Sequence, residues 1–202
     1  MALPSLLSRA SRFAPQEESD LLRQIVIFRI GKEEFGVDIL MVQEIIRLPR
    51  ITPIPNAPAF IVGVLNLRGR VIPVIDLRQR LRIQGNRVEI DDKRTRILII
   101  DLDTHVTGFI VDAVSEVMKV PAREIEPTPH LVVSSVDAEY IKGMIKSQNR
   151  LIVFLDFRRI LNRQEEKDLA DIDLDVLEKD IDGEDTKLDD VFNISYDPEK
   201  VN

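Results

Sequence analysis

Short runs of apolar residues, rich in valine and isoleucine, recur from residue 24 onward. Four of them are IVIFRI (25–30), RILIIDL (96–102), VTGFIVDAV (106–114) and RLIVFLDF (150–157). Runs of this length and composition are typical of β-strands. Turn-forming clusters such as GKEE (31–34) and DTH (103–105) separate them at spacings usual for small sandwiches and barrels. Because no long helical pattern interrupts the runs, the sequence predicts an all-β dominated fold.

The chain also repeats itself. Residues 70–81 (RVIPVIDLRQRL) align with 150–161 (RLIVFLDFRRIL), and 36–49 (GVDILMVQEIIRLP) align with 108–121 (GFIVDAVSEVMKVP). The paired positions include Gly36 with Gly108, Glu44 with Glu116, Gly63 with Gly143, and Asp76 with Asp156. The offset grows from 72 to 80 residues between the two matches, which predicts an eight-residue insertion at about 129–139.

Internal duplication predicts two small barrels, roughly 24–85 and 95–161, within a domain spanning 23–164. Each curls to remove most free strand edges, and the two must pack together because units of this size bury limited surface alone. An exchange of strands between the barrels is left open. Asp76 and Asp156, at equivalent strand ends, are expected to cap a turn or to form a local ion pair with Arg78 or Arg158.

Both ends of the chain depart from the strand pattern. Residues 1–22 contain two prolines and no alternation, which predicts a mobile N-terminal arm, with a membrane-surface helix at 3–13 as the alternative. Residues 165–202 carry fifteen acidic residues against four lysines, a local charge of -11 in a chain of net charge -7. Leu169, Ile172 and Val176 recur at three- and four-residue steps, which predicts an acidic C-terminal helix followed by a tail.

Few residues are suited to catalysis or to binding a cofactor. The chain has no cysteine, and its two histidines, His105 and His130, are expected in exposed loops. No phosphate-binding glycine motif occurs. The segment 171–175 (DIDLD) resembles the start of a calcium loop but places Val176 where such a loop needs glycine. We therefore predict no enzyme activity, no cofactor and no metal site.

Composition also bears on partners and location. There is no apolar run of eighteen residues and no signal-peptide pattern, so we expect a cytoplasmic protein without direct membrane insertion. Outside the acidic extension the chain carries only about +4, and it has no tryptophan and two tyrosines. Barrels that bind single-stranded nucleic acid stack bases on aromatic residues in a positive groove, so we expect no nucleic-acid partner.

A basic hairpin and one acidic residue remain as candidate functional features. Arg68 and Gly69 form the expected turn between two strands, and Glu44 accompanies an apolar stripe of Val42, Ile45 and Ile46. An arginine can hold a carboxylate through two parallel hydrogen bonds. Arg68 is therefore expected to order the hairpin or to bind a partner surface.

Four segments together resemble a known family. They are 28–45 (FRIGKEEFGVDILMVQEI), 51–77 (ITPIPNAPAFIVGVLNLRGRVIPVIDL), 108–117 (GFIVDAVSEV) and 140–161 (YIKGMIKSQNRLIVFLDFRRIL). They resemble the CheW-like family of chemotaxis coupling proteins over about residues 24–163. The resemblance implies two intertwined SH3-like β-barrels. It also implies a non-catalytic adaptor that binds the regulatory domain of a chemotaxis histidine kinase and the cytoplasmic tip of chemoreceptors, in membrane-associated arrays.

By position, the resemblance also nominates docking residues. The kinase-facing candidates are Thr52, Pro53, Ile54, Pro55, Asn56, Gly63, Asn66, Arg68 and Gly69. The receptor-groove candidates are Val42, Glu44, Ile45, Ile46, Val111 and Val114. For each apolar member, burial in a barrel core is an equal alternative. A scaffold of a non-motility chemosensory pathway, such as pilus movement, is the alternative function.

Overall fold

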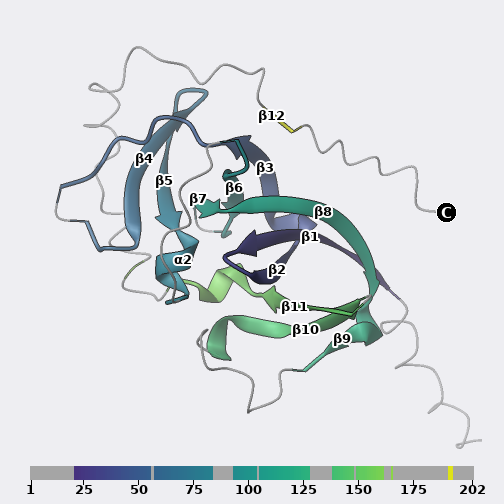
Figure 1. The fold of residues 1–202 in the computed structure, drawn as a ribbon. Coiled ribbons are helices and arrows are strands. Elements are labelled where there is room, and N and C mark those ends of the chain that lie inside the picture. Colours follow the sequence, from purple (N-terminus) through teal and green to yellow (C-terminus); the bar gives the residue numbers. More distant parts are fainter. Residues whose placement is uncertain are drawn as a thin grey trace, which may run out of the picture.

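The computed structural model describes residues 21–55, 57–83, 93–103, 105–127, 138–147, 149–161 and 165, together with the backbone of 191–192. Most of these residues lie in strands, as the apolar runs predict (Figure 1). In chain order the elements are β1 (Leu22–Ile30), β2 (Glu33–Asp38), η1 (Ile39–Met41), β3 (Val42–Arg47), β4 (Ile61–Leu67), β5 (Arg70–Asp76), α2 (Leu77–Arg80), β6 (Arg96–Asp101), β7 (Val106–Val111), β8 (Ala113–Pro121), η2 (Ala122–Glu124), β9 (Ile125–Glu126), η3 (Ala138–Tyr140), β10 (Ile141–Ser147), β11 (Arg150–Leu155), η4 (Phe157–Arg159) and β12 (Val191–Phe192).

The two halves of the chain exchange a hairpin. The strands form two sheets, in the orders β8-β1-β2-β11-β10-β9 and β12-β3-β6-β7-β5-β4. Hairpin β1–β2 thus completes a sheet of second-half strands, and hairpin β6–β7 completes a sheet of first-half strands. In each sheet the exchanged hairpin makes the one parallel pairing, β2 with β11 and β7 with β5. We call the barrel of β3, β4, β5, β6 and β7 barrel 1, and the barrel of β1, β2, β8, β10 and β11 barrel 2.

Aligned glycines of the duplication occupy equivalent places in the two barrels. A Cβ atom on Gly36 would lie 2.7 Å from Cγ2 of Ile25, and one on Gly108 would lie 2.9 Å from Cγ2 of Ile97. Both distances are too short for van der Waals contact between carbon atoms, so a side chain would push the neighbouring strand away. The duplication is therefore visible in the packing as well as in the sequence.

The aligned aspartates cap short helices. The Asp76 carboxylate accepts a hydrogen bond from the backbone N–H of Arg78 at the start of α2, and Asp156 accepts one from the N–H of Arg158 at the start of η4. The turn-cap alternative is thus confirmed. The two guanidinium groups bind other carboxylates, those of Asp112 and Asp103.

Strand residues alternate between two kinds of core. In β6, Ile97 and Ile99 belong to a cluster inside barrel 1, whereas Leu98 and Ile100 belong to a cluster between the two sheets. Strand β1 alternates in the same way between the interior of barrel 2 and the space between the sheets. Strands buried on both faces read as continuous apolar runs, which explains segments such as RILIIDL.

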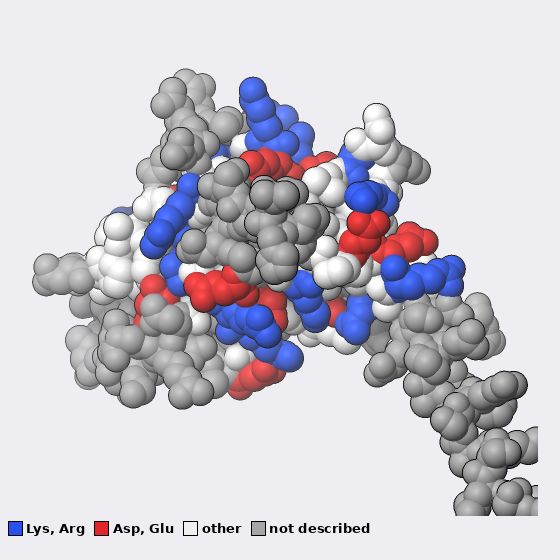
Figure 2. Space-filling view, turned by 90° about the horizontal axis from the view of Figure 1, so that it is seen from below, with Lys and Arg blue, Asp and Glu red and all other residues white. Residues whose placement is uncertain are grey.

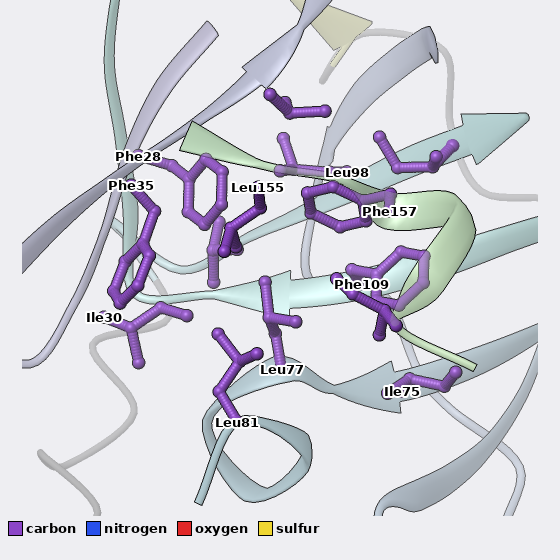
Figure 3. Packing of buried hydrophobic residues seen from close by; sticks show 14 of the residues in the cluster. Phe28, Ile30, Phe35, Ile75, Leu77, Leu81, Leu98, Phe109, Leu155 and Phe157 are labelled. Carbon is purple, nitrogen blue, oxygen red and sulfur yellow. The ribbon is translucent and has the colours of Figure 1, made fainter. Parts of the chain in front are cut away.

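The cluster between the sheets, here called the inter-barrel core, contains four phenylalanines. The ring of Phe157 meets the rings of Phe109 and Phe28 edge-on, with centroids 4.8 and 6.2 Å apart, and Phe28 stacks on Phe35 at 5.9 Å (Figure 3). These residues come from β1, β2, β7 and the start of η4. Chain segments from both halves therefore share one apolar interior.

Two buried arginines connect α2 to the second half of the chain. Arg78 pairs with Asp112, at the junction of β7 and β8. Arg80 donates hydrogen bonds to the carbonyl oxygen of Ile160 at 2.6 Å and to the carboxylate of Glu165 at 2.9 Å. A buried charge is costly unless it is paired, so these contacts fix the position of α2 against the second half.

Several expectations from the sequence fall on residues outside the described ranges. They concern the N-terminal arm (1–20), most of the insertion (128–137), His130, the calcium-like segment, and the acidic extension apart from Glu165 and the backbone of 191–192. His105 is described, and it is half-buried rather than exposed. The Leu102 N–H donates to the His105 carbonyl at 3.0 Å, and this tight turn holds His105 beside the buried Leu102.

The inter-barrel core is expected to dominate stability. Replacing Phe157, which is fully buried, by alanine should lower the free energy of unfolding by about 3–5 kcal/mol, because the cavity removes contacts to both sheets. Urea denaturation measures this change. Leu40→Ala is the control, because Leu40 is 79% exposed and should change stability by less than about 0.5 kcal/mol. A similar small loss for Phe157→Ala would contradict the shared core.

Candidate functional site

The β4–β5 hairpin ends in a two-residue turn made by Arg68 and Gly69. Leu67 pairs with Arg70 across the hairpin, and both turn residues have positive φ angles, 56° and 78°. Two consecutive positive φ angles define the type I′ turn that suits the twist of a tight hairpin. The Asn66 side-chain oxygen accepts a hydrogen bond from the Gly69 N–H at 2.8 Å. Asn66 therefore shapes the turn that presents Arg68.

Arg68 reaches back from this turn to Glu44 on β3. Its Nη1 lies 2.5 Å from Oε1 of Glu44, and its Nη2 lies 3.2 Å from Oε2. In barrel 1, β3 and β4 are the first and last of the five strands β3-β6-β7-β5-β4, and the two-residue β12 lies beyond β3. This two-point ion pair therefore connects the two sides of the seam between β3 and β4. The Arg68 side chain is 54% exposed, and ion pairs at such a surface contribute only about 1 kcal/mol or less.

Barrel 2 has an equivalent seam pair. Glu116, which aligns with Glu44, accepts a hydrogen bond from Arg150 of the β10–β11 hairpin at 2.7 Å, and Glu34 lies 3.4 Å from the same guanidinium. The hydrogen bond from Arg150 to Glu116, followed by the charge of Glu34, raises the pKa of Arg150 above its ordinary value. Arg150 aligns with Arg70 rather than with Arg68. Both copies thus tie this glutamate to a hairpin arginine, but from different hairpin positions.

The kinase-facing candidates lie along β4 and at the hairpin tip. The Thr52 backbone exchanges two hydrogen bonds of 2.8 Å with Val64 of β4. A Cβ atom on Gly63 would lie 2.1 Å from the Thr52 carbonyl oxygen, so glycine is required for this approach. Of this candidate set, Thr52, Ile54 and Asn66 are partly buried, Gly63 is buried, and Pro53, Pro55, Arg68 and Gly69 are exposed. Asn56 lies outside the described residues.

The receptor-groove candidates divide between core and surface. Ile45 and Val111 belong to the inter-barrel core, and Ile46 belongs to the core of barrel 1; these three side chains are at most 3% exposed. These three residues thus follow the alternative of burial in a core, because their side chains pack inside the two clusters. Val42 and Val114 lie partly exposed at the margin of the inter-barrel core.

Sequence reasoning missed an exposed apolar residue beside Val42. Leu40, in η1, is 79% exposed, while its neighbours Ile39 and Met41 pack partly against the inter-barrel core. The segment DILMV reads as one apolar run, and nothing in its composition distinguishes the outward residue. The short η1 turn, capped by the Asp38 carboxylate on the Leu40 N–H at 3.1 Å, turns Leu40 outward.

The charged surface is mixed. On the face shown in Figure 2, basic and acidic side chains are interspersed rather than gathered in one basic field. Such a face differs from the continuous basic groove of nucleic-acid-binding proteins. Among the described residues, no acidic or histidine cluster could hold a metal ion, and no helix is long and apolar enough to cross a membrane.

Comparison with known proteins agrees with this geometry. The sequence model of the CheW-like domain family matches residues 24–165, which include nearly all of both barrels. The chain belongs to the CheW-like domain family. A solved structure, the scaffolding protein TtCheW of Thermoanaerobacter tengcongensis, shares this fold with a TM-score of 0.64 at 33% identity, covering 77% of this chain and 94% of that one.

Relatives of the chain come from several bacteria and carry different names. Chemotaxis protein CheW of Klebsiella aerogenes is 37% identical over 143 residues, which are 71% of this chain and 84% of the relative. Protein FrzA of Myxococcus xanthus is 29% identical over 150 residues, which are 73% of this chain and 91% of the relative.

The seam pair of Glu44 and Arg68 is expected to contribute little to stability. A double-mutant cycle with Glu44→Ala and Arg68→Ala, measured by urea denaturation, should give a coupling energy of about 0.2–1 kcal/mol, because both groups retain contact with water. The exposed pair of Glu126 and Lys146, 2.7 Å apart, serves as the control cycle. A coupling above about 2 kcal/mol would contradict this and assign the pair a purely structural role.

Gly63 is expected to act through folding. Gly63→Ala should cost at least about 2 kcal/mol of unfolding free energy, because the new Cβ collides with the Thr52 carbonyl and the backbone φ of 153° is strained for alanine. Gly69→Ala is the comparison, since Gly69 has open space around it but a φ of 78°; it should cost about 1 kcal/mol. Equal losses for the two variants would refute the collision.

Proposed function

We propose that this chain is a non-catalytic adaptor that couples chemoreceptors to a chemotaxis histidine kinase. Membership of the CheW-like domain family carries the proposal. The described residues add to it, because they present an apolar framework with small exposed elements at its margin. Such an arrangement suits binding rather than chemistry.

The kinase-facing surface is proposed to be the exposed part of the first candidate set. Pro53 and Pro55 precede β4, and Arg68 and Gly69 form the hairpin tip. The seam pair holds Arg68 in one orientation, so that less side-chain entropy is lost when a partner binds. Thr52, Gly63 and Asn66 are positioning residues, because they fix the backbone that carries the exposed members.

The receptor-facing surface is proposed to lie at the margin of the inter-barrel core. Val42 and Val114 are partly exposed there, Leu40 stands beside Val42 in sequence, and Glu44 follows on the same strand. Partly exposed apolar residues with a neighbouring charge suit an amphipathic helix, which is the form of a receptor coiled coil. Glu44 would then face both its seam partner Arg68 and the incoming helix.

Coupling follows if the two surfaces are occupied together. Kinase conformations that differ in their affinity for the receptor-bound adaptor would change in population when the receptor changes state. No bond is made or broken by the adaptor itself. The ion pair of Glu44 and Arg68 connects the two proposed surfaces, because Glu44 belongs to the receptor-facing set and Arg68 belongs to the kinase-facing set.

A second candidate is a scaffold in another chemosensory pathway. The similarity to protein FrzA of Myxococcus xanthus favours keeping it. The chemistry of the adaptor would be the same, and only the partner proteins would differ.

Calorimetric titration of the full chain tests the proposal. Titration against the kinase regulatory domain and, separately, against a receptor-tip fragment of the same organism should give saturable binding to both. Arg68→Ala should weaken kinase binding about tenfold or more, and Val114→Asp should weaken receptor binding similarly, because each removes or charges an interface residue.

The matched control is Arg23→Ala. Arg23 is also an exposed arginine paired with a carboxylate, that of Asp38 at 3.4 Å, and this variant should bind both partners normally. Binding to the regulatory domain of another chemosensory kinase, without binding to that of the chemotaxis kinase, would favour the second candidate. Binding to neither class of partner would refute both.

A further inference from the structure

The short strand β12 lies far from the rest of the folded chain in sequence but pairs with β3. Val191 pairs with Ile46, and Phe192 pairs with Ile45, in an antiparallel register. Figure 1 shows β12 beside β3, at the end of the sheet opposite β4. The C-terminal extension thus contributes a strand to barrel 1.

The edge that β12 occupies would otherwise be open. The other edge of β3 pairs with β6, and no other described strand lies beyond β3. An open edge presents unpaired N–H and C=O groups that can add a further strand. Natural proteins cover such edges, and here the chain covers it with its own extension.

The sequence around β12 suits this place. The four residues before Val191 are Lys187, Leu188, Asp189 and Asp190, within an extension of local charge -11. Strand β3 ends at the exposed Arg47, and Arg50 follows it, also exposed. Opposite charges attract each other most strongly in water of low ionic strength. Val191 and Phe192 also have high strand propensity.

We propose that residues 191–192 of the C-terminal extension act as an intramolecular strand that occupies the open edge of β3 and restricts access of a partner to that strand. Val42 and Glu44 lie on β3 itself, one to four residues from the positions paired with β12. A partner that docks on β3 must therefore compete with residues 191–192. The strand pairing stands on the topology alone, whereas its effect on receptor docking rests on the function proposed above.

The effect of this competition on the dissociation constant of a partner can be calculated. When only a fraction of molecules has the edge free, the apparent dissociation constant equals the intrinsic one divided by that fraction. A two-residue strand opens easily, so the free fraction is expected to be roughly a tenth to a third. Release of β12 should then lower the dissociation constant of the receptor fragment about three- to tenfold.

The test uses the full chain with Val191→Pro and Phe192→Pro together. Proline has no backbone N–H and disfavours strand pairing. The matched control replaces two other apolar residues of the same extension, Ile181→Pro with Leu188→Pro. Urea denaturation should give the same midpoint for all three proteins, because β12 lies outside the cores.

Hydrogen exchange at β3 is the first measurement. Successive N–H groups of a strand point to opposite edges, so one of the amides of Ile45 and Ile46 faces β12. That amide should exchange about three- to tenfold faster in the β12 variant than in the wild type or the control. Unchanged exchange would overturn the strand pairing. Protection that rises with protein concentration would show that a second copy supplies the strand, which would overturn the intramolecular form.

Titration with the receptor-tip fragment is the second measurement. A three- to tenfold tighter complex for the β12 variant alone supports competition. Faster exchange with an unchanged dissociation constant would overturn the restriction of access while keeping the strand. If neither the wild type nor the variants bind the fragment, the receptor function fails and the restriction with it, whereas the exchange result still decides the strand.

Discussion

The inter-barrel core is the constraint on which the rest of the structure depends. Each barrel is completed by a hairpin from the other half of the chain, and the strands bury one face inside a barrel and the other face between the sheets. Neither barrel can therefore form as an independent unit of consecutive strands. The phenylalanine contacts of Phe28, Phe109 and Phe157 join segments from both halves. Because interiors are close-packed, a change in one barrel is felt at the face that it shares with the other.

This double burial also decides what the surface can offer to a partner. Apolar residues that follow one another in β3 point alternately into two cores, so Ile45 and Ile46 are both removed from solvent. Next to these buried residues, the partly exposed Val42 and Val114 and the exposed Leu40 remain available. A partner thus meets a rigid framework with small apolar features, and binding need not disturb the cores. That separation lets an adaptor keep its fold while its interfaces change.

The two seam pairs use equivalent glutamates but differ in the position and exposure of the arginine. Glu44 and Glu116 each bind a hairpin arginine, yet the arginine comes from non-equivalent positions, Arg68 in one barrel and Arg150 in the other. Arg150 contacts two carboxylates, whereas Arg68 contacts that of Glu44 and is 54% exposed at the tip of its hairpin. Arg68 is therefore the more exposed of the two arginines, and an exposed ion pair contributes only about 1 kcal/mol or less to stability.

The sequence by itself determined the strands, the duplication, the tight turn at Arg68 and Gly69, and the caps at Asp76 and Asp156, because these depend on local periodicity and on residues with few conformational options. The motifs also identified the family. Only the tertiary structure decided which strands pair, which apolar residues of β3 are buried, and that Leu40 faces solvent. A continuous apolar run does not indicate which neighbour covers each face of the strand. An exchange of hairpins also leaves the hydrophobic pattern of each strand unchanged. For the same reason, the pairing of β12 with β3 could not be read from an acidic extension whose composition predicts a helix and a tail.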